Sequence, residues 1–216
     1  IKLTMITITS ADHHPIIVDG LTHILKNTIH EIIDVVSDGK DLIASLEEEV
    51  PDLVIMEIDM PNLQGLTAIK ELRKLFPGIK IMVYSTHPEG MYALSAIKAG
   101  AMGYIGKTAD TATVLKAVIQ VARGGIYLNN NLVEMLSNTD PSHNSTLAYR
   151  YKKLSTRETE VLNMLSSGKR NKDIAESLDI NEKTVSTYKT RLLKKLDAGS
   201  LAELIQQARL LQTSDL

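Results

Sequence analysis

Five apolar runs of strand length alternate with segments of helical periodicity over the first 107 residues, and this alternation restricts the fold more than any other feature. The runs are MITITSA (5–11), IIDVVS (32–37), DLVIMEI (52–58), IKIMVYS (79–85) and GYIG (103–106). Helical segments separate them, and a fifth, ADTATVLKAVIQVARGG, follows the last run. Such alternation favours a parallel sheet with right-handed crossovers and helices on both faces. We therefore expect residues 1–125 to form a doubly wound, flavodoxin-like α/β domain with a five-stranded parallel sheet.

The chain changes character twice after residue 125. Residues 126–153 include YLNNNLVEMLSN (127–138), which favours a short helix, and continue as TDPSHNSTLAYRYKK (139–153), which is polar and has no hydrophobic period. We expect this second stretch, roughly residues 138–153, to be a linker. Residues 154–216 carry helix signals throughout, and we expect them to form a separate all-α domain.

The helices expected in this last domain have identifiable ends. In LSTRETEVLNMLSSGK, Ser155 and Glu158 have the spacing of a capping box, and Gly168 suits a C-terminal cap. Asn171 and Asn181 suit the N-caps of two further helices, NKDIAESL and EKTVSTYKTRLLKKL, with about three residues between them. The apolar stripe of a last amphipathic helix consists of Leu201, Leu204, Ile205, Ala208 and Leu211.

Composition limits the classes of function. The 216 residues include no cysteine, which excludes disulfides, thiolate nucleophiles and cysteine metal sites and suits a reducing compartment. No apolar run approaches the roughly 20 residues of a membrane span, and the N-terminus lacks the apolar core of a signal peptide. We therefore expect a soluble, cytoplasmic protein that does not associate with a membrane.

The net charge of −2 conceals an uneven distribution. Residues 1–125 contain 11 Lys and Arg against 15 Asp and Glu, whereas residues 150–216 contain 13 against 9. The first part is therefore acidic, at −4, and the last part is basic, at +4. An acidic domain joined to a basic one indicates that only the basic one binds a polyanion.

The two short helices with a tight turn between them have the geometry of a helix-turn-helix, whose second helix enters the major groove. Between residues 183 and 195 every charged residue is basic. The residues that can form the packed face are Val185, Leu192, Leu193 and Leu196. A solvated, lysine-rich surface is the simpler interpretation, but the turn, the caps and the absence of acids favour binding to double-stranded DNA.

Residues 154–196 resemble the LuxR-type DNA-binding domain through LSTRETEVLNMLSSGKRNKDIAESLDINEKTVSTYKTRLLKKL. The resemblance implies that Ser186, Thr187 and Thr190 reach base edges. The phosphate-binding residues that it implies are Lys183, Lys189, Arg191 and Lys194. Several relatives have lysines in place of Ser186 and Thr190, and hydroxyls pair with several bases. We therefore expect a weaker base preference or a contribution from DNA shape.

A second candidate site follows the expected strands, because function in a doubly wound sheet gathers at the carboxyl ends of the strands. The residues at those ends are Asp12, His13, Glu57, Ser85, Thr86 and Lys107. The segments ADHHP (11–15), EIDMP (57–61), YST (84–86) and GYIGK (103–107) resemble the receiver domain of response regulators over about residues 5–124. Together the two domains resemble the NarL/FixJ family of transcriptional response regulators over nearly the whole chain.

The receiver resemblance implies a phosphorylation chemistry. In the family, two acidic residues after the first strand, the carboxylate after the third and a backbone carbonyl hold Mg²⁺. The third-strand aspartate attacks a phosphohistidine or small phosphodonor, a lysine pairs with the phosphoryl group, a hydroxyl follows it, and an aromatic ring repacks. Lys107, Ser85 and Tyr104 stand at the last three of these positions. Tyr104 is equally interpretable as a half-buried packing residue.

The sequence departs from the family at two positions. His13 replaces the second acid, and imidazole is a poor ligand for Mg²⁺. Glu57 replaces the phosphoacceptor aspartate, and its extra methylene displaces the attacking oxygen from the geometry of in-line transfer. We expect no resident cofactor; should Mg²⁺ bind, Asp12 and Glu57 are its candidate ligands. His14 is expected only to start a helix before Pro15.

Three interpretations of this crevice remain open. In the first, Glu57 is a fixed carboxylate that faces Lys107 and partly imitates the phosphorylated state. In the second, the site still binds metal or accepts phosphate through Glu57 or Asp59. In the third, Asp12, His13 and Glu57 hold a soft metal ion.

We expect a DNA-binding transcriptional regulator, not an enzyme, whose control is independent of the usual aspartyl phosphorylation. The family resemblance implies a homodimer paired through the last helix, with a sensor kinase or an auxiliary protein as a further partner. One alternative is a conventional response regulator phosphorylated at Glu57 or Asp59. The other is a Mg²⁺-dependent phosphohydrolase with that carboxylate pair, which would leave the basic helix pair without a role.

Overall fold

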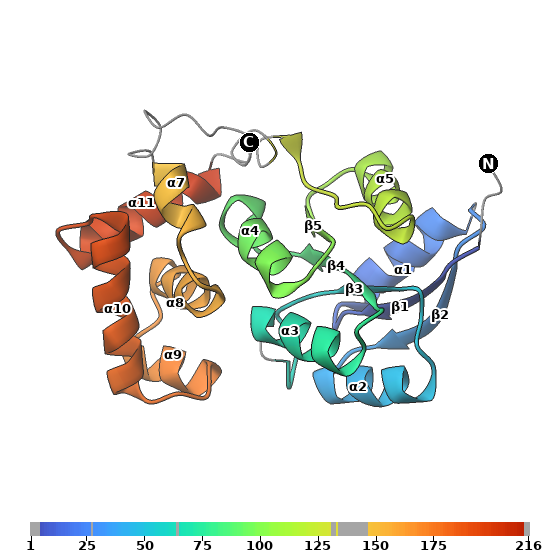
Figure 1. Cartoon of the computed structure of the whole chain (residues 1–216), viewed down its shortest axis with the longest axis horizontal. Coiled ribbons are helices and arrows are strands. Elements are labelled where there is room, and N and C mark those ends of the chain that lie inside the picture. The colour runs from blue at the N-terminus through green and yellow to red at the C-terminus, as the bar shows by residue number, and fades with distance from the viewer. Residues whose placement is uncertain (1–4, 27, 64, 131–132, 134–146, 214–216) are drawn as a thin grey trace. The chain divides into compact units, whose positions relative to one another are not determined.

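The computed structural model describes residues 5–26, 28–63, 65–130, 133 and 147–213 of the chain (Figure 1). Its contacts divide the chain into two compact units, Ile1–His87 with Ala96–Leu128, and Pro88–Ser95 with Asn129–Leu216. Among the described residues, no helix is both long enough and apolar enough to cross a membrane.

The first unit contains a five-stranded parallel sheet in the order β2-β1-β3-β4-β5. Its strands are β1 (Thr7–Ala11), β2 (Glu31–Val36), β3 (Leu53–Met56), β4 (Lys80–Ser85) and β5 (Gly103–Gly106). Each strand end lies within two residues of the end expected from the sequence. The doubly wound α/β fold is therefore confirmed.

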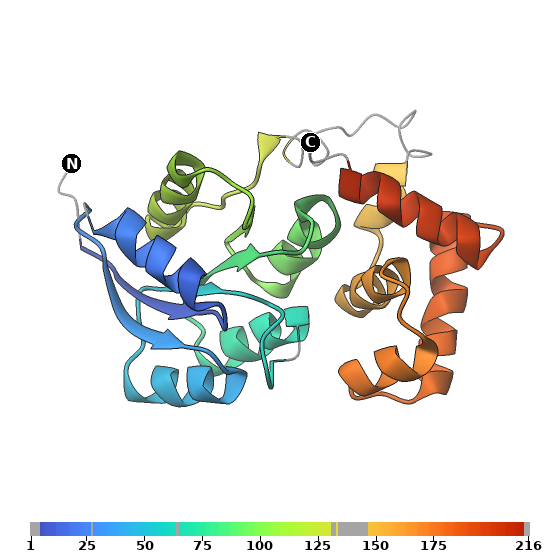
Figure 2. The same ribbon diagram turned by 180° about the vertical axis from the view of Figure 1, so that it is seen from behind.

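Four helices connect successive strands: α1 (Pro15–Leu25), α2 (Gly39–Glu48), α3 (Gly65–Leu75) and α4 (Glu89–Ala99). A fifth helix, α5 (Thr111–Ala122), follows β5. Figures 1 and 2 show α1 and α5 on one face of the sheet and α2 and α3 on the other. Aspartates at two helix starts satisfy backbone N–H groups: Asp38 accepts from Lys40 N at 2.8 Å, and Asp110 accepts from Thr113 N at 2.8 Å.

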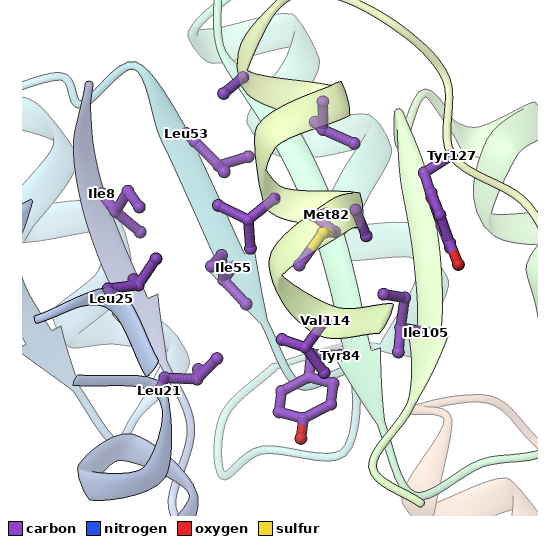
Figure 3. Close-up of a cluster of buried hydrophobic side chains, with 14 of the residues drawn as sticks. Ile8, Leu21, Leu25, Leu53, Ile55, Met82, Tyr84, Ile105, Val114 and Tyr127 are labelled. Carbon is purple, nitrogen blue, oxygen red and sulfur yellow. The ribbon is translucent and has the colours of Figure 1, made fainter. Parts of the chain in front are cut away.

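A cluster of apolar side chains fills the space between the sheet and the helices α1 and α5 (Figure 3). Alternate residues of a strand point to the same face, so each strand contributes every second residue. The strand and helix residues labelled there include Ile8, Leu21, Leu25, Leu53, Ile55, Met82, Ile105 and Val114. This packing holds the strands in register, and their carboxyl ends consequently lie along one edge.

The second unit is helical. Its C-terminal helices are α7 (Leu147–Lys152), α8 (Thr156–Ser166), α9 (Asn171–Ser177), α10 (Glu182–Leu196) and α11 (Leu201–Thr213). Ser155 and Glu158 form the expected capping box at the start of α8, and Gly168 adopts a φ of +79° just after that helix. Asn181 caps α10 by accepting the Thr184 N–H at 2.8 Å. Buried apolar residues that join these helices include Val161, Leu162, Ile174, Val185, Leu192, Leu196, Leu204 and Ala208.

Three expectations about this part of the chain need correction. Arg170, not Asn171, is the N-cap of α9, because Asp173 accepts the Arg170 N–H at 3.0 Å and so satisfies that donor. The turn between α9 and α10 has four residues, 178–181, rather than three. The expected linker contains α7, where Arg150 donates to Leu196 O at 2.9 Å. The short helix expected in YLNNNLVEMLSN lies largely outside the described residues.

Candidate functional site

The receiver-like crevice lies at the carboxyl ends of β1, β3, β4 and β5. Backbone hydrogen bonds continue the sheet past those ends: Glu57 N donates to Ala11 O at 2.9 Å, and Lys107 N donates to Ser85 O at 2.8 Å. As a result, the side chains of Asp12, Glu57, Ser85 and Lys107 meet at one edge of the sheet. The structure therefore brings together four of the residues expected there.

Glu57 is 1% exposed, and donors surround its carboxylate. Its Oε1 accepts the backbone N–H groups of Ile58 at 2.7 Å and Asp59 at 3.1 Å. The same oxygen accepts the Ser85 hydroxyl at 2.5 Å. Three donors occupy the lone pairs of this oxygen, so it has no acceptor capacity left for another partner.

The second oxygen of Glu57 faces a buried ammonium. Oε2 accepts from Thr86 N at 3.1 Å and lies 2.9 Å from Lys107 Nζ. Lys107 Nζ also lies 2.6 Å from Asp12 Oδ2. The side chains of Lys107, Asp12 and Glu57 are 6%, 4% and 0% exposed, so water screens none of these charges effectively. One ammonium thus joins two carboxylates, and hydroxyl and backbone donors supply the remaining stabilisation.

The pKa of Glu57 is the net result of opposing effects. Burial raises it, because desolvation disfavours the charged form. Hydrogen bonds from Ser85 and Lys107, the charge of Lys107 and the Asp59 N–H lower it, and together they hold the pKa of Glu57 below its ordinary value. Glu57 is therefore an anion at neutral pH.

His14 belongs to this crevice, which the sequence reasoning missed. Its backbone N–H donates to Asp12 Oδ1 at 2.9 Å, and its Nδ1 lies 2.9 Å from the same oxygen. That nitrogen is also 3.4 Å from Lys107 Nζ. His14 does precede α1 as its N-cap residue, as expected, although its side chain makes no capping bond. The available signal was the Asp-x-His spacing, since an aspartate commonly accepts from the backbone two residues on.

The side chains whose spacing would suit a metal ion lie on the loop that follows β1. Among the described residues, Asp12, His13 and His14 form a group whose ligand atoms lie within 4.8 Å of one another. Glu57, which the third interpretation placed beside Asp12 and His13 as a ligand, is outside this group, and donors contact both of its oxygens. In the described part of the chain, Lys107 forms ion pairs with the carboxylates of both Asp12 and Glu57. The residue after Asp12 is His13, whose imidazole is exposed. This arrangement does not fit the octahedral oxygen shell that Mg²⁺ prefers.

Asp59 and Tyr104 occupy different environments. The Asp59 side chain is 78% exposed, and its carboxylate lies 3.9 Å from His87 Nε2. Tyr104 is 0% exposed and donates its hydroxyl to His87 O at 3.0 Å. His87 N donates to Ser85 Oγ at 3.1 Å. Tyr104 is therefore fully buried rather than half-buried, and the His87 backbone connects it to the hydroxyl that binds Glu57.

The residues expected to contact DNA lie on α10. Those with exposed side chains are Lys183, Ser186, Thr187, Thr190, Arg191 and Lys194. Lys189 is half-buried, and its Nζ donates to Asn171 Oδ1 at 3.3 Å. The Asn171 amide donates in turn to Ser186 Oγ at 3.2 Å. Asn171 therefore links α9 to α10, a role that its assignment as a helix cap did not anticipate.

The hydroxyls on this surface are bonded to the helix itself. Ser186 Oγ donates to Glu182 O at 3.1 Å. Thr187 Oγ1 donates to Lys183 O at 3.0 Å, and Thr190 Oγ1 donates to Ser186 O at 3.1 Å. In each case the hydroxyl proton is used within α10, and the oxygen keeps its capacity to accept.

Lys195 stabilises the fold of this unit. Its Nζ lies 2.7 Å from Glu158 Oε2, the carboxylate of the capping box. Burial raises the pKa of Glu158, but Lys195 and Ser155 outweigh that effect and hold the pKa below its ordinary value. The C-terminal half of α10 is thereby attached to the start of α8.

Comparison with known proteins matches both parts of the chain to protein families. Residues 8–119 match the response regulator receiver domain, and residues 152–208 match the bacterial regulatory proteins of the luxR family. The virulence-factor transcription regulator BvgA of Bordetella pertussis is 36% identical over 199 residues, which cover 92% of this chain and 94% of BvgA. The oxygen regulatory protein NreC of Staphylococcus carnosus is 33% identical and covers 93% of this chain and 95% of NreC.

Solved structures show the same fold at lower identity. RcsB from Salmonella enterica serovar Typhimurium, bound to the promoter P1flhDC, matches with a TM-score of 0.75 and 23% identity. That match covers 94% of this chain and 97% of the RcsB chain. RcsB bound to the promoter rprA matches with a TM-score of 0.74 at 22% identity, covering 94% and 98% of the two chains.

Proposed function

This chain belongs to the response regulators that carry a receiver domain and a LuxR-type domain, and we propose that its receiver works without the usual aspartyl phosphorylation. It is a DNA-binding transcriptional regulator of the response-regulator type. The proposal for the receiver rests on one observation, the position of Lys107 Nζ between Glu57 Oε2 at 2.9 Å and Asp12 Oδ2 at 2.6 Å.

With Lys107 in this position, the site does not meet two requirements of phosphoryl transfer. The attacking oxygen needs a free lone pair and an open approach, but five donor groups of described residues surround the buried Glu57 carboxylate. The metal needs oxygen ligands, but Lys107 already neutralises the carboxylates that would supply them. Glu57 is therefore a structural anion and not a nucleophile.

The same contacts support a partial imitation of the phosphorylated state. In the family, the lysine pairs with the phosphoryl group and the hydroxyl follows it. Here Lys107 and Ser85 make the corresponding contacts with Glu57 itself, at 2.9 Å and 2.5 Å. Tyr104 is buried and bonded to the backbone that holds Ser85. We therefore place control outside the crevice, at the level of protein abundance, a partner protein or a small ligand.

Incubation with Mg²⁺ and acetyl phosphate, followed by intact mass measurement, tests this proposal. The wild-type chain is expected to gain no phosphoryl group, because Glu57 has no free lone pair for attack. The double variant His13→Asp/Glu57→Asp, which restores the family's two acids, is expected to gain one and so shows that the assay works. A stoichiometric adduct that maps to Glu57 in the wild type would contradict the proposal, and an adduct at Asp59 would support the conventional alternative.

We further propose that the chain binds DNA in the cytoplasm as a homodimer. The RcsB structures include two dimers bound to two parallel DNAs, with a TM-score of 0.70 and 22% identity to this chain. In α11, Leu204 and Ala208 are buried within the unit, whereas Leu201 and Ile205 are only half-buried. Those two half-buried apolar residues support pairing of two copies through α11.

The salt dependence of DNA binding measures how many phosphates the basic side chains of α10 neutralise. If about four or five phosphates are neutralised per subunit, the slope of log affinity against log salt is about −4 per subunit and nearly twice that for a dimer. Fluorescence anisotropy with a labelled duplex gives this slope, and light scattering of the complex gives its stoichiometry. Affinity that hardly changes between low and moderate salt would contradict the assignment of α10.

The enzymatic alternative lacks support in the site. A phosphohydrolase would need Glu57 and Asp59 to act as a pair, but Glu57 is saturated with donors and the Asp59 side chain is 78% exposed. The relatives are transcription regulators. We therefore propose that the chain has no phosphatase activity, and phosphatase turnover without a DNA complex would favour the enzyme instead.

A further inference from the structure

Four side chains of α10 form one stripe along the helix. Lys183, Thr187, Thr190 and Lys194 are separated by four, three and four positions, which is the spacing of a single helical face. All four are exposed. Two threonines therefore occupy the middle of the stripe and a lysine occupies each end.

The neighbouring residues Ser186 and Lys189 are held toward α9. Ser186 Oγ donates to Glu182 O at 3.1 Å and accepts from the Asn171 amide at 3.2 Å. Lys189 Nζ donates to Asn171 Oδ1 at 3.3 Å. Asn171 thus positions both side chains by hydrogen bonding to each of them. The two threonines are then the residues of the stripe that remain available to contact bases.

The threonine hydroxyls present an acceptor, because each proton is already donated within the helix. Thr187 Oγ1 donates to Lys183 O at 3.0 Å, and Thr190 Oγ1 donates to Ser186 O at 3.1 Å. Each side chain then offers one oxygen that accepts and one methyl group. Turning a hydroxyl toward an acceptor on a base would break its bond within the helix, and this cost, roughly 2- to 10-fold in affinity, would offset the gain from the new bond.

Base pairs differ in what they offer such a surface. In the major groove an A·T pair presents the adenine N6 amino group, which donates, and the thymine methyl group. A G·C pair presents the guanine O6 and N7 acceptors and has no methyl group, although cytosine N4 donates. An accepting oxygen next to a methyl group is therefore complementary to an A·T pair.

We propose that Thr187 and Thr190 select A·T base pairs in the operator by accepting from adenine N6 and packing their methyl groups against thymine. Lys183 and Lys194 bind the phosphates on either side of these base pairs. This proposal rests on the proposed binding of DNA through α10. The resemblance alone implied a weaker base preference, whereas this proposal predicts a defined preference for A·T pairs.

Selection of duplexes from a pool randomised over two helical turns tests the base preference with the full chain. The enriched sequences are then rebuilt with deoxyuridine in place of thymine, or with purine lacking the N6 amino group in place of adenine. Thr187→Val and Thr190→Val keep the shape but remove the accepting oxygen, whereas Thr187→Ser keeps the oxygen and removes the methyl group. Glu47→Ala, an exposed change on α2, is the control for general effects on the surface.

The expected result is A·T pairs at the centre of each half-site. Each valine variant is expected to bind these sites roughly 3- to 10-fold more weakly and to lose sensitivity to removal of N6 at one base pair. Thr187→Ser is expected to bind the thymine and deoxyuridine sites equally at that pair, while the wild type discriminates between them. Circular dichroism confirms that each variant is folded.

Two other outcomes separate this inference from the function on which it rests. Enrichment of guanine at these positions, or valine variants that keep the wild-type preference, would overturn the role of the threonines while salt-dependent DNA binding stands. Absence of salt-dependent binding to any duplex of the pool would overturn the assignment of α10 to DNA, and this inference with it.

Discussion

Replacement of Glu57 by glutamine provides the sharpest test of the crevice, because it removes the charge and keeps the shape. All five groups around the carboxylate are donors: three N–H groups, the Ser85 hydroxyl and the Lys107 ammonium. A glutamine side chain has one accepting oxygen, and its NH₂ group would take the place of the other carboxylate oxygen. That NH₂ group would then face hydrogen-bond donors and could not bond to them. Hydrogen bonds to charged groups each contribute about 1.5–3 kcal/mol, and Lys107 keeps Asp12 as a partner. We expect Glu57→Gln to lower the free energy of unfolding by about 2–4 kcal/mol.

Urea titration with pulsed hydrogen exchange and mass spectrometry measures this effect in the receiver alone, because peptides of β1, β3 and β5 are followed separately from the C-terminal helices. A shift of the midpoint by about 1–2 M urea is expected at neutral pH. Asp59→Asn removes the same charge two residues away at a side chain that is 78% exposed, and should change stability by about 0.5 kcal/mol or less. Equal midpoints for wild type and Glu57→Gln would refute the structural role of the anion.

The pH dependence of this difference has a defined sign. The pKa of Glu57 is lower in the folded protein than its ordinary value of 4.5, so its charge stabilises the fold above pH 4.5. That contribution is lost as the pH falls through the lowered pKa of the folded state. The midpoints of wild type and Glu57→Gln are therefore expected to converge below pH 4.5, and a difference that grows with acidification would contradict the direction of the shift.

Three further perturbations address other contacts. Lys195→Met removes the ion pair with Glu158 and should destabilise the C-terminal unit by about 1 kcal/mol, since the Lys195 side chain is 37% exposed and partly screened; the urea midpoint of its peptides measures this. Tyr104→Phe removes the hydroxyl that donates to His87 O and should cost about 1 kcal/mol of receiver stability, and an unchanged midpoint would show that the bond contributes nothing. Lys183→Ala should reduce the log-log salt slope of DNA binding by about 1 per subunit, whereas an unchanged slope would exclude a phosphate contact.

The elements of the fold were predictable because their signals are local. Alternating and helical periods located all five strands to within two residues at each end. The capping box of Ser155 and Glu158 and the cap by Asn181 depend on residues three apart, and the structure confirms both. The cap assigned to Asn171 was wrong, because Asp173 satisfies the start of α9 and Asn171 is used between helices instead.

The members of the candidate site and the contact of Glu57 with Lys107 were predictable, but the other contacts of the site were not. Parallel strands end at one edge, so Asp12, Glu57, Ser85 and Lys107 could be grouped from their positions after strands. His14 was missed, because its contact with Asp12 depends on the turn of the loop and on its rotamer. The full set of hydrogen bonds to the Glu57 carboxylate could not be predicted either. Its donors include backbone N–H groups, and residue types do not specify the directions of those groups.

The succession of strands and helices along the chain, the basic character of the last domain and the presence of His13 and Glu57 after the first and third strands could be read from the sequence alone. These properties follow from residue type and spacing along the chain. The three-dimensional fold was needed to show that Lys107 lies between two carboxylates and that the hydroxyls of Thr187 and Thr190 donate to backbone carbonyls within α10. A hydroxyl can donate or accept, and an ammonium can bind any nearby anion; the partner is chosen by distances between side chains that folding alone sets.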